Sequence, residues 1–227
     1  MSNDMLELSA PLLPDTLRLP LAPRGNEALA EVSVWRDAFP ARDEGEAAAQ
    51  WFSRAIQAPV RLVRFDPSVV RYASRQWTGS AESPVQFADG FPLLVTSEAS
   101  LAEVNRRLAL KGAPAIPMDR FRPNLVLRGL EAFDEDFIDT VSVGDNVVLR
   151  FVKPCARCPI TTVDQSNGKH DSNWPHEPLD TLAGWRVDAR VDGGLTFGQN
   201  AIVVAGAGAR LRAGVDAHCE WNFPQTI

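Results

Sequence analysis

The most reactive side chains of this sequence lie in the run Pro-Cys-Ala-Arg-Cys-Pro at residues 154–159. This run follows an apolar, strand-like stretch from Val147 to Lys153. A thiolate is both a nucleophile and a soft metal ligand, and Arg157, between Cys155 and Cys158, provides a positive field that favours a charged sulfur. The run therefore predicts thiolate chemistry.

The residues alone leave three interpretations of this cysteine pair open. A thioredoxin-like redox pair should open a helix, but Pro159 and a strand-prone stretch at 160–163 follow it. A zinc site would add His170 and His176, although prolines flank His176 and the histidines of a zinc finger lie on a helix. In the third interpretation, one cysteine is a buried core residue and the other is incidental.

Composition narrows the classes of protein to consider. The 227 residues are 45% hydrophobic and 23% charged, as in ordinary globular proteins, and the net charge of −6 argues against a nucleic-acid partner. Cys219 makes the cysteine count odd, which in the absence of a signal peptide predicts free thiols and a cytoplasmic location. No segment approaches the roughly 20 apolar residues of a membrane span, so no membrane association is expected.

The first part of the chain alternates strand and helix signals. Strands are expected within Leu6–Leu21, Glu31–Trp35 and Val60–Phe65. Asp43 precedes a helix signal and stands three residues before Glu46, as in a capping box. The segment Asp66–Pro84 is expected to be a loop. The apolar face of the helix would consist of Ala47, Ala48, Trp51, Phe52, Ala55 and Ile56.

The later part predicts one long helix and a series of short strands. A strand at Phe91–Thr96 leads to a helix capped by Ser97 and Ser100, with Leu101, Val104 and Leu108 facing the core. Evenly spaced short strands with glycine-marked turns are typical of a barrel. These strands are Leu125–Leu130, Thr140–Val143, Val147–Lys153, Trp185–Val191 and Ala201–Ala205.

A set of short motifs occurs in a fixed order along the second part. They resemble the MOSC family, named for the carboxy-terminal domain of the molybdenum cofactor sulfurase, and most closely its mitochondrial amidoxime reducing component branch and bacterial relatives. The motifs are Asp89-Gly90-Phe91-Pro92, Ser97-Glu98-Ala99-Ser100, Phe121-Arg122-Pro123-Asn124, Pro154-Cys155-Ala156-Arg157-Cys158, Thr161-Thr162-Val163-Asp164, Pro178-Leu179-Asp180-Thr181-Leu182 and Phe197-Gly198-Gln199-Asn200.

The resemblance implies an α+β, mostly β fold. Residues 81–227 would be a MOSC-type β-barrel with peripheral helices. Residues 1–80 would be a partial amino-terminal β-barrel-like domain, because the residues at 45–51 and 61–63 look like its later half. The family's Lys-Ser turn, which holds the cofactor phosphate, would lie upstream of this chain. Weaker cofactor retention than in full-length relatives is therefore expected.

The resemblance also assigns a site for the molybdenum cofactor (Mo-molybdopterin), with no expectation of pyridoxal phosphate. Cys158 would be the metal ligand and catalytic centre, and Cys155 would be structural. Thr161, Thr162 and Asp164 would orient the loop as neighbours of these residues. The cofactor-binding residues would be Ala156, Arg157, Arg122, Asn124, Asp89, Gly90 and Asn200, the last at a position that is often tyrosine in the family.

The implied activity is a two-electron reduction of small N-hydroxylated compounds. Electrons would come from a separate donor protein of a ferredoxin- or cytochrome-type reductase system. Two alternatives remain: a MOSC module that carries sulfur or cofactor on Cys158 without turnover, and a non-catalytic truncated homologue.

Overall fold

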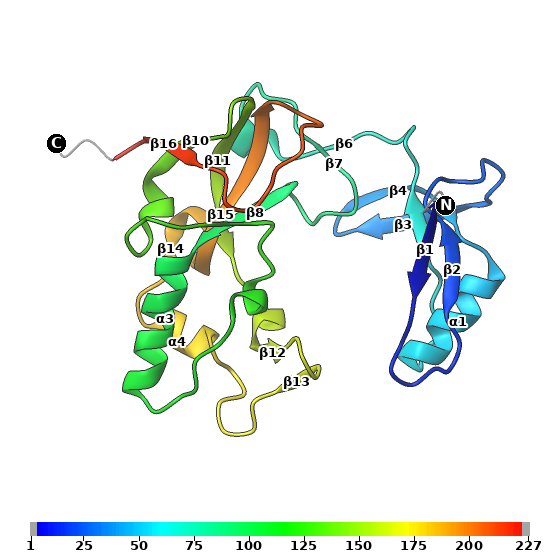
Figure 1. The fold of residues 1–227 in the computed structure, drawn as a ribbon, viewed down its shortest axis with the longest axis horizontal. Helices are drawn as coiled ribbons and strands as arrows, with labels where there is room; N and C mark the ends of the chain where they lie inside the picture. Colours follow the sequence, from blue (N-terminus) through cyan, green and yellow to red (C-terminus); the bar gives the residue numbers. More distant parts are fainter. Residues whose placement is uncertain (1–3, 224–227) are drawn as a thin grey trace. The chain divides into compact units, whose positions relative to one another are not determined.

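The computed structural model describes residues 4–223, which lie in two compact units divided between Arg71 and Tyr72 (Figure 1). Strand β6 (Arg71–Tyr72) lies at this division. The sequence predicts a boundary later, between residues 80 and 81. The mostly β fold class predicted from the sequence is confirmed.

Residues 4–71 of the first unit form strands β1 to β5 and helix α1. β1 (Met5–Leu8) and β2 (Leu17–Pro20) form an antiparallel pair. A separate antiparallel sheet has the order β3-β4-β5, with β3 at Leu29–Val34, β4 at Asp37–Asp43 and β5 at Val63–Phe65. The core of this unit is closed by α1 (Glu46–Ile56), whose Ala48 and Trp51 pack against Leu17 and Leu19 of β2.

The start of α1 differs from the predicted capping box. The residue that caps the helix is Gly45, with a φ of 92°, and no side chain caps it. Asp43 accepts a hydrogen bond from the Gly45 N–H at 2.7 Å, but its carboxylate is mainly held by the guanidinium of Arg61. This pairing holds the pKa of Asp43 below its usual value. At the other end Ile56, predicted to face the core, is 58% exposed.

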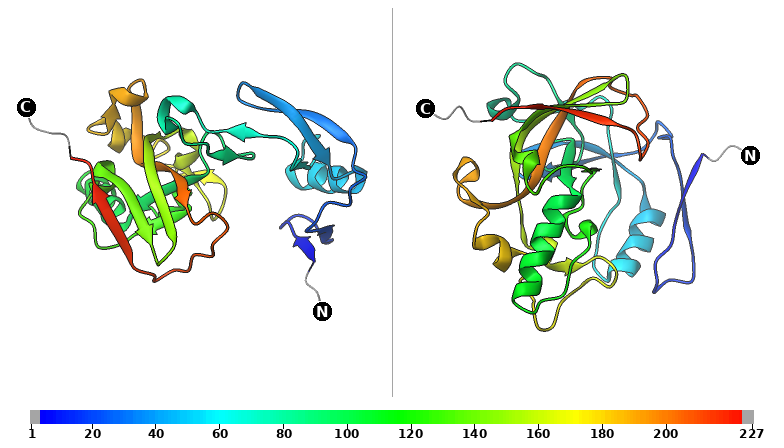
Figure 2. Two further views of the ribbon diagram at one scale, coloured as in Figure 1. Left: turned by 90° about the horizontal axis from the view of Figure 1, so that it is seen from above. Right: turned by 60° about the vertical axis from the view of Figure 1, so that its left-hand side comes forward.

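The second unit is built on one curled sheet with the order β16-β10-β11-β15-β8-β9, and β14 also pairs with β15 (Figure 2). All neighbours are antiparallel except β8 and β9, which are parallel. The sheet forms a half-barrel, which is consistent with the MOSC-type β-barrel that the sequence predicts. The strands are β8 (Leu93–Ser97), β9 (Leu125–Leu127), β10 (Ile138–Val143), β11 (Val147–Ala156), β14 (Val187–Asp188), β15 (Gly194–Ala205) and β16 (Ala217–Trp221).

Two helices lie side by side against this sheet (Figure 1): α3 (Glu98–Leu110) and α4 (Leu179–Ala183). Ser97 caps α3 by accepting a hydrogen bond from the Ser100 N–H, so the predicted cap is confirmed. Val104 and Leu108 of α3 are fully buried with Leu182, and beside them the rings of Phe121 and Phe197 stack at 3.7 Å between their centres.

Close contact between β8 and β15 requires glycine at position 198. Gly198 has a φ of 76°, and a Cβ there would lie 2.7 Å from the Val95 carbonyl oxygen. No other residue fits this position without moving β8. The remaining elements are short: α2 (Arg75–Thr78), β7 (Pro84–Val85), β12 (Val163–Asp164), β13 (Lys169–His170), and the 3₁₀ turns η1 (Met118–Phe121), η2 (Asp134–Phe137), η3 (Pro159–Thr162) and η4 (Ala189–Val191).

Several predicted strands have different limits in the structure. The segment predicted as a strand at Trp185–Val191 forms only the two residues of β14 before η4 begins, because Asp188 caps η4 by accepting from the Arg190 N–H. The predicted loop Asp66–Pro84 contains α2. By contrast, β11 runs three residues beyond its predicted end at Lys153, to Ala156, and so includes Cys155.

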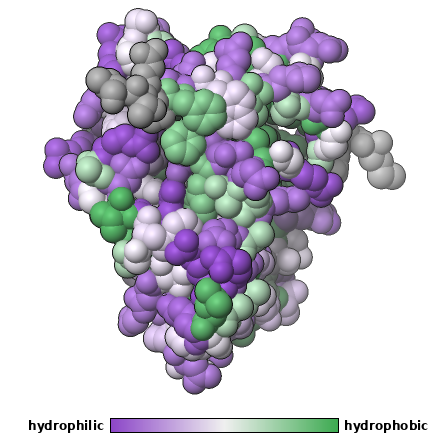
Figure 3. All heavy atoms as spheres, turned by 90° about the vertical axis from the view of Figure 1, so that its left-hand side faces the viewer, coloured by the Kyte–Doolittle hydropathy of each residue, from purple (hydrophilic) through white to green (hydrophobic). Residues whose placement is uncertain are grey.

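The surface carries no extended apolar face in the view of Figure 3, where small green areas alternate with purple ones. Single exposed apolar side chains of this kind are ordinary in globular proteins. Among the helices of residues 4–223, none is long and apolar enough to cross a bilayer.

Candidate functional site

The two cysteines lie where β11 leaves the sheet. The pairing of β11 with β15 shifts register between Phe151 and Lys153 and again between Pro154 and Ala156. Such irregularities bend a strand and turn its last side chains in a new direction. Cys155 is half-buried at the end of the strand, whereas Cys158 is exposed and precedes η3. The two thiols therefore occupy different environments.

Arg157 holds together the end of β11 and the turn that follows it, residues 154–162, which we call the cysteine corner. Its Nη1 donates to the Cys155 Sγ at 2.8 Å, and its Nη2 donates to the Phe121 carbonyl at 2.7 Å. Its backbone N–H donates to the Leu195 carbonyl at 2.7 Å. These contacts fix the guanidinium in one orientation and use the Cys155 sulfur as an acceptor. The Nε of Arg157 is buried and has no hydrogen-bond partner.

The turn after Cys158 is stabilised by its own threonines. Thr161 Oγ1 donates to the Cys158 carbonyl at 3.1 Å, and Thr162 Oγ1 donates to the Pro159 carbonyl at 2.7 Å. Both threonines are buried. The segment predicted as a strand at 160–163 is thus mainly η3, because these hydroxyls close the turn. They give the Cys158 backbone a defined position.

Arg120 joins this turn to η1. Its Nη1 donates to the Thr161 carbonyl at 3.3 Å, and its Nη2 lies 3.9 Å from the carboxylate of Asp164. The pKa of Asp164 is lowered, first by the Ser166 hydroxyl and backbone N–H and then by Arg120. Sequence reasoning missed Arg120, since a lone arginine in a short turn usually lies at the surface. Its side chain is only 8% exposed.

The geometry supports neither of the first two open interpretations of the cysteine pair. His170 Nδ1 shares a hydrogen bond of 2.9 Å with Thr162 Oγ1, and no group of three or more histidine, cysteine or acidic residues in the described part of the chain could hold a metal ion. A zinc site therefore has no support in this arrangement. The α-helix that a thioredoxin-like pair should open is replaced by η3, and the cysteines are free.

Arg122 lies next to this corner with its charge unused. It has a left-handed backbone conformation, with φ 56° and ψ 48°, immediately after the Phe121 carbonyl that Arg157 binds. Its side chain is exposed and makes no hydrogen bond or ion pair within residues 4–223. Non-glycine residues adopt this conformation rarely, and it is concentrated at functional sites.

Asn124 and Asn200 are tied to the sheet rather than free. Asn124 accepts from the Leu94 N–H at 2.8 Å and donates its own backbone N–H to the Leu94 carbonyl at 2.9 Å. Asn200 is opposite Leu94 in β8 and opposite Lys153 in β11, and its Nδ2 donates to the Lys153 carbonyl at 3.3 Å. Both asparagines therefore lie in one row that ends beside the cysteine strand.

Asp89 and Gly90 lie in the bend before β8. The Asp89 carboxylate is exposed and makes no hydrogen bond or ion pair in the described part of the chain, and a Cβ on Gly90 would have no atom within 4 Å. The centre of the ring of Phe91, the next residue, lies 5.9 Å from the Lys153 Nζ. The bend is thus connected to β11 two residues before Cys155.

The residues of this corner fit an anionic cofactor that carries a thiophilic metal. The exposed thiol of Cys158, the free guanidinium of Arg122 and the buried, unpaired Nε atoms of Arg120 and Arg157 are donors or ligands without partners among the described residues. Buried polar atoms without partners are costly, and a bound ligand can satisfy them.

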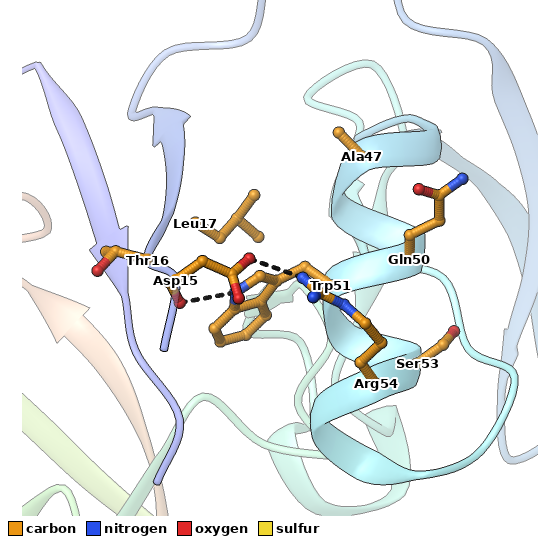
Figure 4. A pocket seen from close by; sticks show the side chains of 8 residues that line it. All are labelled: Asp15, Thr16, Leu17, Ala47, Gln50, Trp51, Ser53 and Arg54. Carbon is orange, nitrogen blue, oxygen red and sulfur yellow. Dashed lines mark hydrogen bonds and ion pairs between the residues drawn. The ribbon is translucent and has the colours of Figure 1, made fainter. Parts of the chain in front are cut away.

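A cavity of the first unit differs from this site, because its charged side chains are paired with each other (Figure 4). Its volume is about 750 Å³. In Figure 4, Asp15 points toward Trp51 and Arg54: its carboxylate is 2.6 Å from Arg54 Nη2, and its carbonyl accepts from Trp51 Nε1 at 3.1 Å. These polar groups satisfy one another and leave no free charge for a ligand.

Comparison with known proteins decides the family. The MOSC domain matches residues 82–215. The chain belongs to the MOSC family. The cysteine corner, Arg122 and both asparagines lie inside the matched region of this MOSC protein.

Curated relatives of this MOSC protein extend the likeness to most of the chain. It is 38% identical to "Mitochondrial amidoxime-reducing component 1" of Mus musculus over 188 residues, which is 82% of this chain and 53% of the relative. It is 36% identical to the Homo sapiens protein of the same name, over 81% of this chain and 53% of the relative. A component 2 protein of Bos taurus is also 36% identical, with coverage of 82% and 53%. The chain spans about half the length of these relatives.

Proposed function

We propose that this MOSC protein binds the molybdenum cofactor at the cysteine corner and reduces small N-hydroxylated compounds. The observation that carries the proposal is the exposed thiol of Cys158 beside guanidinium groups with unused donors, in a chain similar to proteins named amidoxime-reducing components. Electrons would come from a separate ferredoxin- or cytochrome-type donor system.

Each residue of the corner has a proposed part in holding the cofactor. Cys158 is the metal ligand, since a thiolate is a soft donor. Arg122 and the Arg157 Nε face anionic and acceptor groups, a task that suits a guanidinium. Ala156, Asn124, Asn200, Asp89 and Gly90 are proposed to line the cofactor; for Asn124 and Asn200 the support is the row they share with β11.

The reaction breaks one N–O bond and consumes two electrons and two protons, releasing the reduced nitrogen compound and water. The cofactor, when bound, supplies the redox centre for these electrons. The protein supplies the thiolate of Cys158, its fixed backbone and the positive groups around it. Cys155 keeps Arg157 in place by accepting its Nη1 hydrogen bond.

The proposal also covers features outside the corner. Residues 81–227 would be the MOSC domain, and residues 1–80 would correspond to part of the family's amino-terminal β-barrel-like domain. The cytoplasmic location stays a prediction, and the names of the relatives place those proteins in mitochondria.

A second function, carriage of sulfur or cofactor on Cys158 without turnover, is favoured by the same exposure of this thiol. A persulfide on Cys158 in protein that holds no molybdenum would support the carrier.

Elemental analysis of three variants tests the proposal. Protein expressed with ample molybdate should contain molybdenum in proportion to protein. Cys158→Ser should lose it, whereas Cys155→Ser should retain it, because a serine hydroxyl can also accept from Arg157. Cys219→Ser, in β16, which β10 separates from β11, is the matched control. Molybdenum retained by Cys158→Ser, or absent from all four proteins, would contradict the proposal.

A further inference from the structure

Lys153 in β11 carries a positive charge close to two aromatic rings. Its Nζ lies 5.2 Å from the centre of the Trp77 ring and 5.9 Å from the centre of the Phe91 ring. Trp77 belongs to α2 and Phe91 precedes β8, so three separate segments meet here. All three side chains are half-buried. A cation at these distances is attracted by the faces of the rings.

The ammonium of Lys153 has no acidic partner. No carboxylate among residues 4–223 lies within ion-pair distance of its Nζ. Lys111, by contrast, is paired with Glu177 and donates to the Thr181 hydroxyl. The protein as a whole has a net charge of −6, so a half-buried lysine without an acidic partner creates a local positive potential that attracts anions.

Lys153 lies in the same row of the sheet as Asn200, one of the residues proposed to line the cofactor. Lys153, Asn200 and Leu94 are opposite one another in β11, β15 and β8, and partners in antiparallel strands face the same side. Leu94 binds Asn124, and Lys153 is two residues before Cys155. Lys153 is therefore bonded through its carbonyl to Asn200 and lies in the same strand as Cys155, which places it at the edge of the candidate site.

The segments that carry Trp77 and Phe91 are attached to the sheet. Arg150, also in β11, donates from Nη2 to the Thr78 carbonyl at 2.6 Å, which attaches the end of α2 beside Trp77. Phe91 is two residues before the start of β8. Because these segments are attached, a flat ligand would not need to order them on binding.

We propose that Trp77, Phe91 and Lys153 form a substrate subsite for a planar aromatic ring that bears an acidic group. The ring contacts the two aromatic side chains, and the anionic substituent pairs with the Lys153 ammonium. The preferred N-hydroxylated compounds are then aromatic acids rather than neutral or basic ones. The identity of the reacting group rests on the proposed function; the anion preference rests on these three side chains.

Binding of unreactive analogues tests the subsite independently of catalysis. The probes are 4-carboxybenzamide and benzamide, titrated against the full chain while tryptophan fluorescence is recorded. We expect the carboxylate to bind about tenfold more tightly, as a charge-assisted hydrogen bond provides. Lys153→Gln should remove this preference and leave benzamide binding unchanged, and Lys153→Arg should retain it. Lys169→Gln, at an exposed lysine in β13, is the matched control for the loss of a positive charge. Trp77→Phe should remove most of the fluorescence change.

The remaining outcomes decide against the subsite or separate it from the proposed function. Equal binding of both probes, or a preference that survives Lys153→Gln, overturns it. If Lys153→Gln lowers molybdenum retention and inorganic phosphate competes with the carboxylate, Lys153 serves the cofactor phosphate and the substrate subsite is wrong. In loaded protein, 4-carboxybenzamidoxime should show a lower KM than benzamidoxime. Selective binding without reduction of either compound would retain the subsite and reject the proposed reaction.

Discussion

The polar cluster of the first unit and the cysteine corner of the second both contain arginines, but these arginines differ in whether they have partners within the protein. In the polar cluster, formed by Arg24, Glu44 and Arg64, the Glu44 carboxylate is 3% exposed and Arg64 binds it together with the carbonyls of Pro20 and Leu21. Next to the cysteine corner, Arg122 has no partner among residues 4–223.

This difference separates structural from binding arginines. A guanidinium that satisfies buried acceptors stabilises the fold, and its removal leaves those acceptors unpaired. A guanidinium without partners contributes little to folding and remains available to a ligand. Arg157 lies between these cases, because two of its nitrogens are used internally and Nε is not.

The largest effect on stability should come from breaking the polar cluster. Arg64→Met leaves the buried Glu44 with only Arg24, so we expect a loss of about 3 kcal/mol in the free energy of unfolding of the first unit. Urea denaturation measures this. The control Arg18→Met removes an ion pair with Glu7 whose partners are 68% and 56% exposed, and it should change stability by less than about 0.5 kcal/mol. Equal effects of the two variants would refute the comparison.

A buried carboxyl of the second unit should give the next effect, visible as pH dependence. Glu135 is fully buried; its Oε2 accepts from Ser97 and Ser100, and its Oε1 has no partner. Burial raises the pKa of Glu135 above 4.5. The folded state then binds the proton more strongly than the unfolded state, so this contribution to stability is complete below about pH 4.5 and is lost as the pH rises through the folded pKa.

Glu135→Gln should remove that loss. Stability curves of wild type and variant, measured from pH 4 to 8, should diverge as the pH rises, with the variant gaining about 2 kcal/mol relative to wild type. Paired carboxylates such as Asp43 and Asp164 have lowered pKa values, so their contributions to stability change with pH in the opposite direction. These contributions are the same in wild type and variant and cancel when the two stability curves are subtracted. Parallel curves would show that Glu135 does not titrate in this range.

Arg157→Met should have a smaller effect on stability and a clear effect on cofactor retention. It removes hydrogen bonds to the Cys155 sulfur and the Phe121 carbonyl, for which we expect a loss of about 1–2 kcal/mol. Molybdenum content after gel filtration should fall in parallel. Full retention of molybdenum by this variant would remove Arg157 from the binding residues.

Arg122→Ala should give the smallest change in stability, within about 0.5 kcal/mol, because no contact is lost. Its cofactor retention should nevertheless fall about tenfold, as for a lost charge-assisted hydrogen bond. Arg128→Ala is the matched control, since Arg128 is 83% exposed and pairs with Glu98. If Arg122→Ala destabilised the fold as much as Arg157→Met, its side chain would have a structural role.

Local signals predicted the elements well where the decisive contacts are themselves local. The Ser97 cap of α3 is an example, because its acceptor and donor are three residues apart. The capping box at Asp43 was wrong because Arg61, 18 residues away, binds that carboxylate. The strand expected at Trp185–Val191 was mostly replaced by η4, where Asp188 bonds to the backbone two residues on.

The candidate site could be predicted only in outline. Cys155 and Cys158 are conspicuous in the sequence, and the resemblance to the MOSC family selected their neighbours, although their roles stay predictions. The partner of Arg157, the Phe121 carbonyl, is 36 residues away, and Arg120 reaches Thr161 across 41 residues. Contacts over such separations depend on how β11 and η1 pack and cannot be read from motif spacing.

The register shifts in β11 constrain the length of this segment. Side chains of a strand alternate between faces, so removing or adding one residue between Phe151 and Cys155 would exchange the faces of Lys153 and Pro154. Homologous sequences should therefore tolerate substitutions here far better than insertions or deletions.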